Sequence, residues 1–173
     1  EKGEHYLDNA ARFIYFSKAV VELSRRMPPS PDLLHAHDWP AALVPVLVRE
    51  QQLPFATVLS IHHLETQGDF PAEDFALTNL PWNYFQPSGV EFFGRLNLLK
   101  GGLRFADRIV VAGEPYAHGL QTDSVGAGPA IVLRDQPGRL VGILPCPALQ
   151  HWNPPPAAFL PAPPRPRPPP PPP

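Results

Sequence analysis

Cysteine is almost absent from the sequence, which holds a single thiol, Cys146, among 173 residues. One thiol excludes a disulfide within the chain and a cysteine-rich zinc site. An excess of charge of one sign is also lacking, because the formal net charge is only −2. That charge provides no basic field for nucleic acid or an anionic membrane surface. No apolar run is long enough to span a bilayer, and residues 1–5 do not resemble a signal peptide. These absences favour a cytoplasmic protein that binds neither nucleic acid nor membranes.

Proline, in contrast, is abundant and unevenly distributed. Of the 27 prolines, thirteen lie within residues 154–173. A segment so rich in proline lacks backbone donors and is predicted to be extended or disordered. We therefore expect one domain over residues 1–153 and a proline-rich tail over residues 154–173. The tail is most simply an incidental terminus, although the word Pro161-Ala162-Pro163-Pro164-Arg165 also fits a partner of the SH3 or WW type.

Short apolar strands alternate with helical segments along residues 1–153. Strands are predicted over about 32–37, 55–61, 107–112 and 140–144, and helices over about 7–26, 41–52, 94–105 and 115–122, with a further helix ending at 133. Phe13, Phe16, Val20 and Leu23 form one face of the first helix, and Pro45 should bend the second. Residues 65–92 show no steady period. This alternation predicts an α/β fold with a Rossmann-like, open, mostly parallel sheet, whose strand at 55–61 is covered on both faces.

Polar side chains follow the ends of the first two predicted strands. The first strand ends in His35, His37 and Asp38, and a longer polar set follows the second: His62, His63, Glu65, Gln67 and Gly68. Ligands of open parallel sheets bind beyond the carboxyl ends of the strands. Because side chains alternate along a strand, His35 and His37 should lie on the same side of the sheet. This edge is therefore the candidate site.

Three interpretations of the edge remain open. Imidazoles and carboxylates are ordinary metal ligands, so a metal-dependent hydrolase would use His35, His37, Asp38 and His62, although the further spaced ligands of such enzymes are missing. A carbohydrate site would use Asp38 and His62 for hydroxyl groups. It would draw its apolar contacts from a set of aromatic residues: Trp39, Trp82, Tyr84, Phe85, Phe92 and Phe93. In a purely structural interpretation, Asp38 caps the helix that begins near Pro40 and His35 packs inside the sheet.

Several words of the sequence also match one family in order. His35-Ala36-His37-Asp38-Trp39 resembles the HxHDW segment of bacterial glycogen synthases and plant starch synthases. The stretch Ser60–Phe70 is similar to that family's T-[IV]-H-N-L-x-Y-Q-G-x-F, and Leu98–Asp107 resembles F-[LM]-K-[AG]-G-[IL]-x-x-A-D. Further matching words extend the resemblance over residues 6–154.

The resemblance implies the N-terminal half of a GT-B fold, in which two Rossmann-like domains face a cleft. It implies retaining transfer of glucose from ADP-glucose, or less often UDP-glucose, to the non-reducing end of an α-1,4-glucan, without a metal or other cofactor. By this resemblance Asp38 lines the donor-sugar side of the cleft and His62 hydrogen-bonds the transferring glucose. The neighbouring substrate-binding candidates are His37, His63, Gln67 and Gly68.

The chain also departs from the family pattern. The family's N-G-[IV]-D word is replaced by Pro145-Cys146-Pro147-Ala148. The family's nucleotide loop, K-x-G-G-L, is expected before residue 1, because the similar run Lys100–Leu103 falls near the end of a predicted helix, where Gly101 and Gly102 indicate a C-cap and tight packing. In the family, the groups that hold the diphosphate come chiefly from the C-terminal domain. We therefore expect a fragment that does not transfer glucose alone; the alternative is a non-catalytic glucan-binding or regulatory module.

Overall fold

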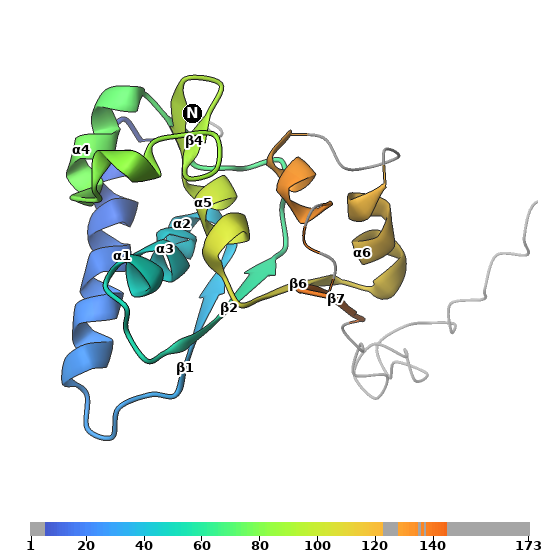
Figure 1. The fold of residues 1–173 in the computed structure, drawn as a ribbon, viewed down its shortest axis with the longest axis horizontal. Helices are drawn as coiled ribbons and strands as arrows, with labels where there is room; N and C mark the ends of the chain where they lie inside the picture. Colours follow the sequence, from blue (N-terminus) through green and yellow to red (C-terminus); the bar gives the residue numbers. More distant parts are fainter. Residues whose placement is uncertain (1–5, 123–127, 135, 137, 145–173) are drawn as a thin grey trace, which may run out of the picture.

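The computed structural model describes residues 6–122, 128–134, 136 and 138–144 (Figure 1). The helices are α1 (Asn9–Arg26), α2 (Asp38–Ala41), α3 (Leu43–Glu50), α4 (Phe75–Thr78), α5 (Leu98–Phe105) and α6 (Glu114–Gln121), with 3-10 turns η1 (Ala72–Asp74), η2 (Trp82–Tyr84) and η3 (Gly128–Leu133). The strands are β1 (Leu33–His37), β2 (Ala56–Ile61), β3 (Asp69–Phe70), β4 (Glu91–Phe92), β5 (Arg95–Asn97), β6 (Arg108–Ala112) and β7 (Leu140–Ile143). The predicted tail lies outside the described residues.

Four strands form a parallel sheet in the order β1-β2-β6-β7. Each of them lies within its predicted range, and the predicted α/β class with a parallel sheet is confirmed. The register aligns His37 with Ser60 and Val58 with Arg108, so the strands end at a common carboxyl edge. This edge carries the candidate site.

Helices cover only one face of this sheet in the described part of the chain. Leu34 and Ala36 of β1, Leu59 and Ile61 of β2, and Ile109 and Val111 of β6 are buried beneath helices. On the other face, Leu33, His35, Ala56, Arg108, Val141 and Ile143 are exposed, Val58 is half-buried and Ser60 is buried. The expected coverage of β2 on both faces is therefore met only toward its carboxyl end, and no helix of the described residues lies on the second face. The strands follow one another in a single direction, and right-handed connections in that order place every helix on the same face.

The long helix α1 buries only part of the predicted face: Phe13 and Val20 are partly buried against the core. Phe16 and Leu23 are 47% and 62% exposed, while Ile14 and Val21 are buried. Two small residues, Ser17 and Ser24, complete the buried face, and the Ser24 hydroxyl donates to the Val20 carbonyl of its own helix. The Ser17 hydroxyl donates to the Pro40 carbonyl of α2 at 3.5 Å, and these two small side chains let α1 pack closely on α2 and α3.

The predicted bend at Pro45 is confirmed as a break between α2 and α3. Pro45 lies in the first turn of α3, where a backbone N–H has no partner within the helix. At the same junction, a Cβ on Gly102 of α5 would lie 2.8 Å from both Ala42 and Leu59. The close packing expected of Gly102 is therefore confirmed. The C-cap interpretation is wrong, because α5 continues to Phe105.

The irregular stretch from 65 to 92 contains order that its sequence does not reveal. Strands β3 and β4 of this stretch pair with β5 in a second, antiparallel sheet, whose strands are too short to produce a periodic pattern. β5 takes up the start of the helix predicted over about 94–105, which begins only at Leu98. Lys100 is buried behind it and donates from Nζ to the carbonyls of Pro87, Gly89 and Glu91. Burial lowers the pKa of Lys100, and the three carbonyl contacts attach the excursion to α5.

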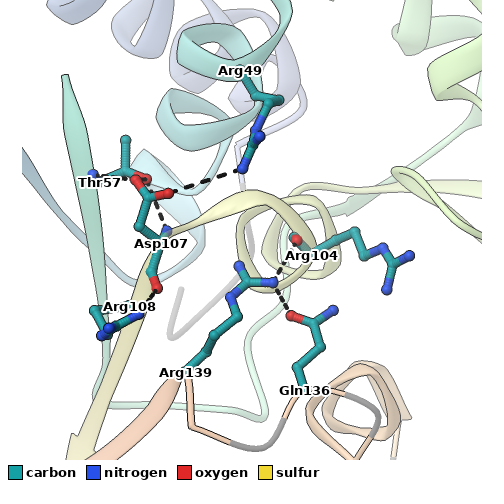
Figure 2. Close-up of polar contacts among 7 residues, drawn as sticks. All are labelled: Arg49, Thr57, Arg104, Asp107, Arg108, Gln136 and Arg139. Atoms are coloured by element: carbon teal, nitrogen blue, oxygen red, sulfur yellow. Dashed lines mark hydrogen bonds and ion pairs between the residues drawn. The ribbon is translucent and has the colours of Figure 1, made fainter. Parts of the chain in front are cut away.

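At the amino edge of the main sheet, the Asp107 carboxylate links β2 to the residue before β6 (Figure 2). Asp107 Oδ2 accepts hydrogen bonds of 2.8 Å from both the backbone N–H and the hydroxyl of Thr57, and Arg49 lies 3.9 Å from Oδ1. Beside it, Arg139 donates to the Arg104 carbonyl at 3.1 Å and to the Gln136 side chain. These contacts tie β2, α3, α5 and the start of β7 together at the edge opposite the candidate site.

Candidate functional site

The candidate site lies where β1 and β2 end side by side. His37 is the last residue of β1 and Asp38 follows it, while His62 and His63 follow the last residue of β2. The structure therefore brings four of the six predicted site residues to one edge, as parallel pairing requires.

Asp38 joins the two strand ends through its side chain. Its Oδ1 accepts hydrogen bonds from the backbone N–H groups of His62, at 2.7 Å, and His63, at 3.2 Å. The residue adopts φ +51°, a left-handed conformation that Asp tolerates better than most residues. The predicted N-cap role is wrong, because α2 begins at Asp38 itself and receives no side-chain cap. Among the described residues, Oδ2 makes no further hydrogen bond, which leaves it available to a ligand.

Three imidazoles line up beside Asp38 on the uncovered face. His35 Nε2 lies 2.8 Å from the Ser60 hydroxyl, and His37 Nδ1 lies 3.1 Å from His62 Nε2. The rings of His35 and His37 are 4.3 Å apart between centroids. His35 is exposed, so its expected burial is wrong, because no helix of the described residues covers this face. Partial burial lowers the pKa of His35, and the neighbouring His37 and His62 lower it further.

These contacts do not form a metal centre. No group of three or more His, Cys, Asp or Glu residues in the described part of the chain is arranged to hold a metal ion. His35 is bonded to Ser60, and His37 and His62 are bonded to each other. The metal-dependent hydrolase has no support from this arrangement.

Gln67 and Gly68 shape the loop that leaves the site. The carbonyls of Gln67 and Gly68 accept from the N–H groups of Leu99 and Leu98, both at 3.0 Å, and so satisfy the first turn of α5. The Gln67 side chain accepts from Asn97 Nδ2 at 2.9 Å. Gly68 has φ +61°, and a Cβ there would lie 2.4 Å from the Trp39 ring. Asn97, which caps α5, is a site neighbour that the sequence analysis missed.

A hollow of about 660 Å³ adjoins this loop. Its lining is acidic and aromatic: Tyr6, Leu7, Trp39, Glu65, Thr66, Gln67, Gly68, Asp69, Phe70, Pro71 and Asp74. It contains Gln67 and Gly68 but none of the four residues at the strand ends. Of the predicted aromatic contacts, only Trp39 lines it, and that ring is mostly core, packed edge-on against Phe13 and Phe70. Asp69 and Asp74 were not predicted, since neither stands in a pattern that marks a site.

The fold is that of part of a GT-B glycosyltransferase catalytic domain. A structural comparison finds the catalytic domain of starch synthase IV from Arabidopsis thaliana, bound to ADP and acarbose, with a TM-score of 0.77 and 28% identity. That match covers 92% of this chain and 34% of the starch synthase chain.

Sequence comparison places the chain more narrowly. The family model of the starch synthase catalytic domain matches residues 1–135, and the chain belongs to this family. A glycogen synthase from Opitutus terrae is 40% identical over 163 residues, which is 91% of this chain and 34% of that protein. One from Thermodesulfovibrio yellowstonii is 41% identical over 155 residues, or 86% of this chain and 31% of that protein. The chain thus spans about a third of the length of these relatives. In the part of the chain that the structure describes, no helix has the length and apolarity to cross a membrane.

Proposed function

We propose that the chain forms one wall of a glucosyl-transfer cleft, in which Asp38 and His62 hold the sugar. The observation that carries this proposal is the 2.7 Å bond from the His62 backbone N–H to Asp38, which fixes the Asp38 carboxylate and the His62 backbone at the carboxyl edge of the sheet. A carboxylate oxygen and an imidazole are suitable partners for sugar hydroxyls. The starch synthase IV domain was solved with ADP and acarbose, which supports a nucleotide sugar and a glucan as the two substrates.

The proposed wall serves the sugar and not the diphosphate. None of the six predicted site residues is Lys or Arg, and no basic residue lines the adjoining hollow, which contains Glu65, Asp74 and Asp69, the last of them paired with Arg95. An acidic surface opposes a diphosphate by charge repulsion, so cations from elsewhere have to stabilise the leaving group. ADP-glucose or UDP-glucose is the proposed donor and an α-1,4-glucan the acceptor, with no metal or other cofactor.

The isolated chain is therefore expected to bind glucan and not to transfer glucose. The purified chain, incubated with labelled ADP-glucose and glycogen, should incorporate no label above background, and measurable incorporation would contradict this part of the proposal. Binding is tested separately with maltotetraose by ligand-observed NMR. The His62→Ala variant should lose the signal, and the His118→Ala variant, altered on α6, should retain it.

A second candidate function is a glucan-binding module that works through an aromatic platform. Trp82 is 67% exposed and its ring rests on Phe75 and Phe85, at centroid distances of 4.9 and 5.9 Å. A rigid exposed indole suits the apolar face of a sugar ring. Co-sedimentation with glycogen distinguishes the two functions: loss on Trp82→Ala favours the platform, and loss on His62→Ala favours the cleft.

A further inference from the structure

We propose that His37 is the positioning residue of His62 and holds its imidazole with the proton on Nε2, so that Nδ1 is left as a hydrogen-bond acceptor for a substrate hydroxyl. The statement about the substrate rests on the proposed function. The statement about the two imidazoles rests on their geometry alone and is measured separately.

Strand register brings the two rings together. His37 pairs with Ser60, so His62, two residues beyond Ser60, is the diagonal neighbour of His37 on the same face. The same offset relates His35, which pairs with Val58, to Ser60. Both diagonal pairs are in contact, at 2.8 Å for His35 and Ser60 and at 3.1 Å for His37 and His62. The His37–His62 contact thus repeats the diagonal contact of His35 with Ser60, and we call these two successive contacts the ladder.

The two imidazoles meet edge to edge. Their planes differ by 6°, their centroids are 5.4 Å apart, and the facing nitrogens are 3.1 Å apart. The ring centroids lie farther apart than the two nitrogens, so the nitrogens lie between the centroids. Because the ring planes are also nearly parallel, the two rings share a plane and face each other through these nitrogens. A nitrogen lone pair lies in the plane of its ring, so this arrangement suits an N–H···N bond.

The ladder is fixed at its inner end. Ser60 is 6% exposed and bonds to His35, whose ring packs on His37. At the outer end, Asp38 holds the backbone N–H of His62. His62 is therefore constrained by its backbone and by its ring, although its side chain is exposed.

The identity of the two nitrogens decides the position of the proton. A neutral imidazole has one donor and one acceptor nitrogen. If His62 Nε2–H donates to His37 Nδ1, both rings carry their proton on Nε2, which is the more stable form of a neutral histidine. If His37 donates, both rings must take the less stable Nδ1–H form. We therefore assign the donor to His62.

This assignment determines what His62 can recognise. A bare Nδ1 accepts a hydrogen bond from a sugar O–H but cannot donate one to a phosphate oxygen, which is only an acceptor. The histidine pair thus selects the hydroxyl-bearing part of a nucleotide sugar or a glucan and not its phosphates.

The direct test is ¹⁵N NMR of the histidine-labelled full chain at about pH 8, above the ordinary histidine pKa. We expect the His62 ring to show a protonated Nε2 and a bare Nδ1, with a through-hydrogen-bond coupling between His62 Nε2 and His37 Nδ1. A protonated Nδ1 on His62, or no coupling between the two rings, would overturn the proposal. This measurement needs no variant.

Variants then test the positioning role. His37→Phe keeps the ring and removes its nitrogens, so His62 should become a mixture of both forms and maltotetraose affinity should fall about fivefold, as for the loss of one ordinary hydrogen bond. His37→Asn places an acceptor oxygen near the lost Nδ1 and should restore the Nε2–H form. His118→Asn is the matched control and should change neither. A His62 spectrum unaltered by His37→Phe would contradict the proposal. Absent maltotetraose binding with the expected spectrum would instead count against the proposed function.

Discussion

The two edges of the parallel sheet differ in the polar contacts that their carboxylates make. At the amino edge, Asp107 Oδ2 accepts hydrogen bonds from the backbone N–H and the hydroxyl of buried Thr57, and Oδ1 faces the Arg49 guanidinium at 3.9 Å (Figure 2). At the carboxyl edge, Asp38 uses only one oxygen for the backbone, and the His37–His62 pair lies exposed. A carboxylate that is bonded to a buried backbone N–H and faced by a cation stabilises the fold, while a carboxylate with no ion-pair partner among the described residues can bind a ligand. The following predictions test that contrast, from the largest expected effect on stability to the smallest.

Removal of the amino-edge carboxylate should cost the most stability. Asp107→Ala removes two charge-assisted hydrogen bonds and leaves the buried backbone N–H of Thr57 without its acceptor. We expect a loss of about 3 kcal/mol in the free energy of unfolding, measured by denaturant titration. Asp32→Ala, an exposed change just before β1, is the control and should stay within about 0.5 kcal/mol. Equal effects of the two changes would contradict the expected contribution of Asp107 to stability.

A side chain at Gly68 should destabilise the carboxyl edge by a smaller amount. Gly68→Ala imposes φ +61° on alanine and places a Cβ against the Trp39 ring. Left-handed strain and overpacking together are expected to cost about 2 kcal/mol. Gly94→Ala, also at positive φ but with open space around its Cβ, measures the strain alone. If both variants lose the same stability, Trp39 does not confine the loop.

The loss of Asp38 should affect ligand binding more than stability. Asp38→Ala removes two backbone contacts at an exposed edge, with an expected cost of about 1 kcal/mol in the free energy of unfolding. Maltotetraose binding should fall below detection, because both Asp38 and the placement of His62 are lost. Asp38→Asn keeps an acceptor for the amides and should recover stability. If Asp38→Ala loses as much stability as Asp107→Ala and still binds maltotetraose normally, Asp38 has a structural role and the two edges do not differ.

The pH dependence of stability should carry a small contribution from His35. Its pKa is lowered in the folded state, so below about pH 6.5 the unfolded chain takes up the proton more readily. This contribution to stability is therefore present above about pH 6.5 and is lost as the pH falls toward the folded-state pKa. Denaturant midpoints measured between about pH 8 and pH 5 should fall less steeply in His35→Gln than in the unsubstituted chain. Identical slopes would show that His35 is not desolvated in the fold.

The sequence predicts the elements of this fold better than their surroundings. Apolar runs identify β1, β2, β6 and β7, and Pro45 marks the break after α2, because both signals are local. The burial of His35 is predicted wrongly and the coverage of β2 only in part correctly, because both depend on which face the crossover helices occupy. The antiparallel sheet of β3, β5 and β4 is missed because its strands are too short to show a period.

For the candidate site too, the sequence predicts some features and misses others. The positions of His37, Asp38, His62 and His63 at one edge follow from parallel pairing. The bond between His37 and His62 and the amide contacts of Asp38 depend on strand register and backbone conformation, which no local pattern shows. Gln67 is found through its family word, whereas Asp69 and Asp74 of the hollow have no signal at all.

The most direct test of the proposed sugar wall is a titration of the ¹⁵N-labelled chain with maltotetraose, followed through the backbone amides. The amides of His62 and His63, both held by Asp38, should shift most, with smaller changes at Gln67 and Gly68 and none after His62→Ala. A full-length glycogen synthase relative, titrated in parallel, gives the maltotetraose concentration that saturates a complete enzyme. If this chain shows no shift at that concentration, or shifts only at Trp82 and its neighbours, the proposed sugar wall is contradicted.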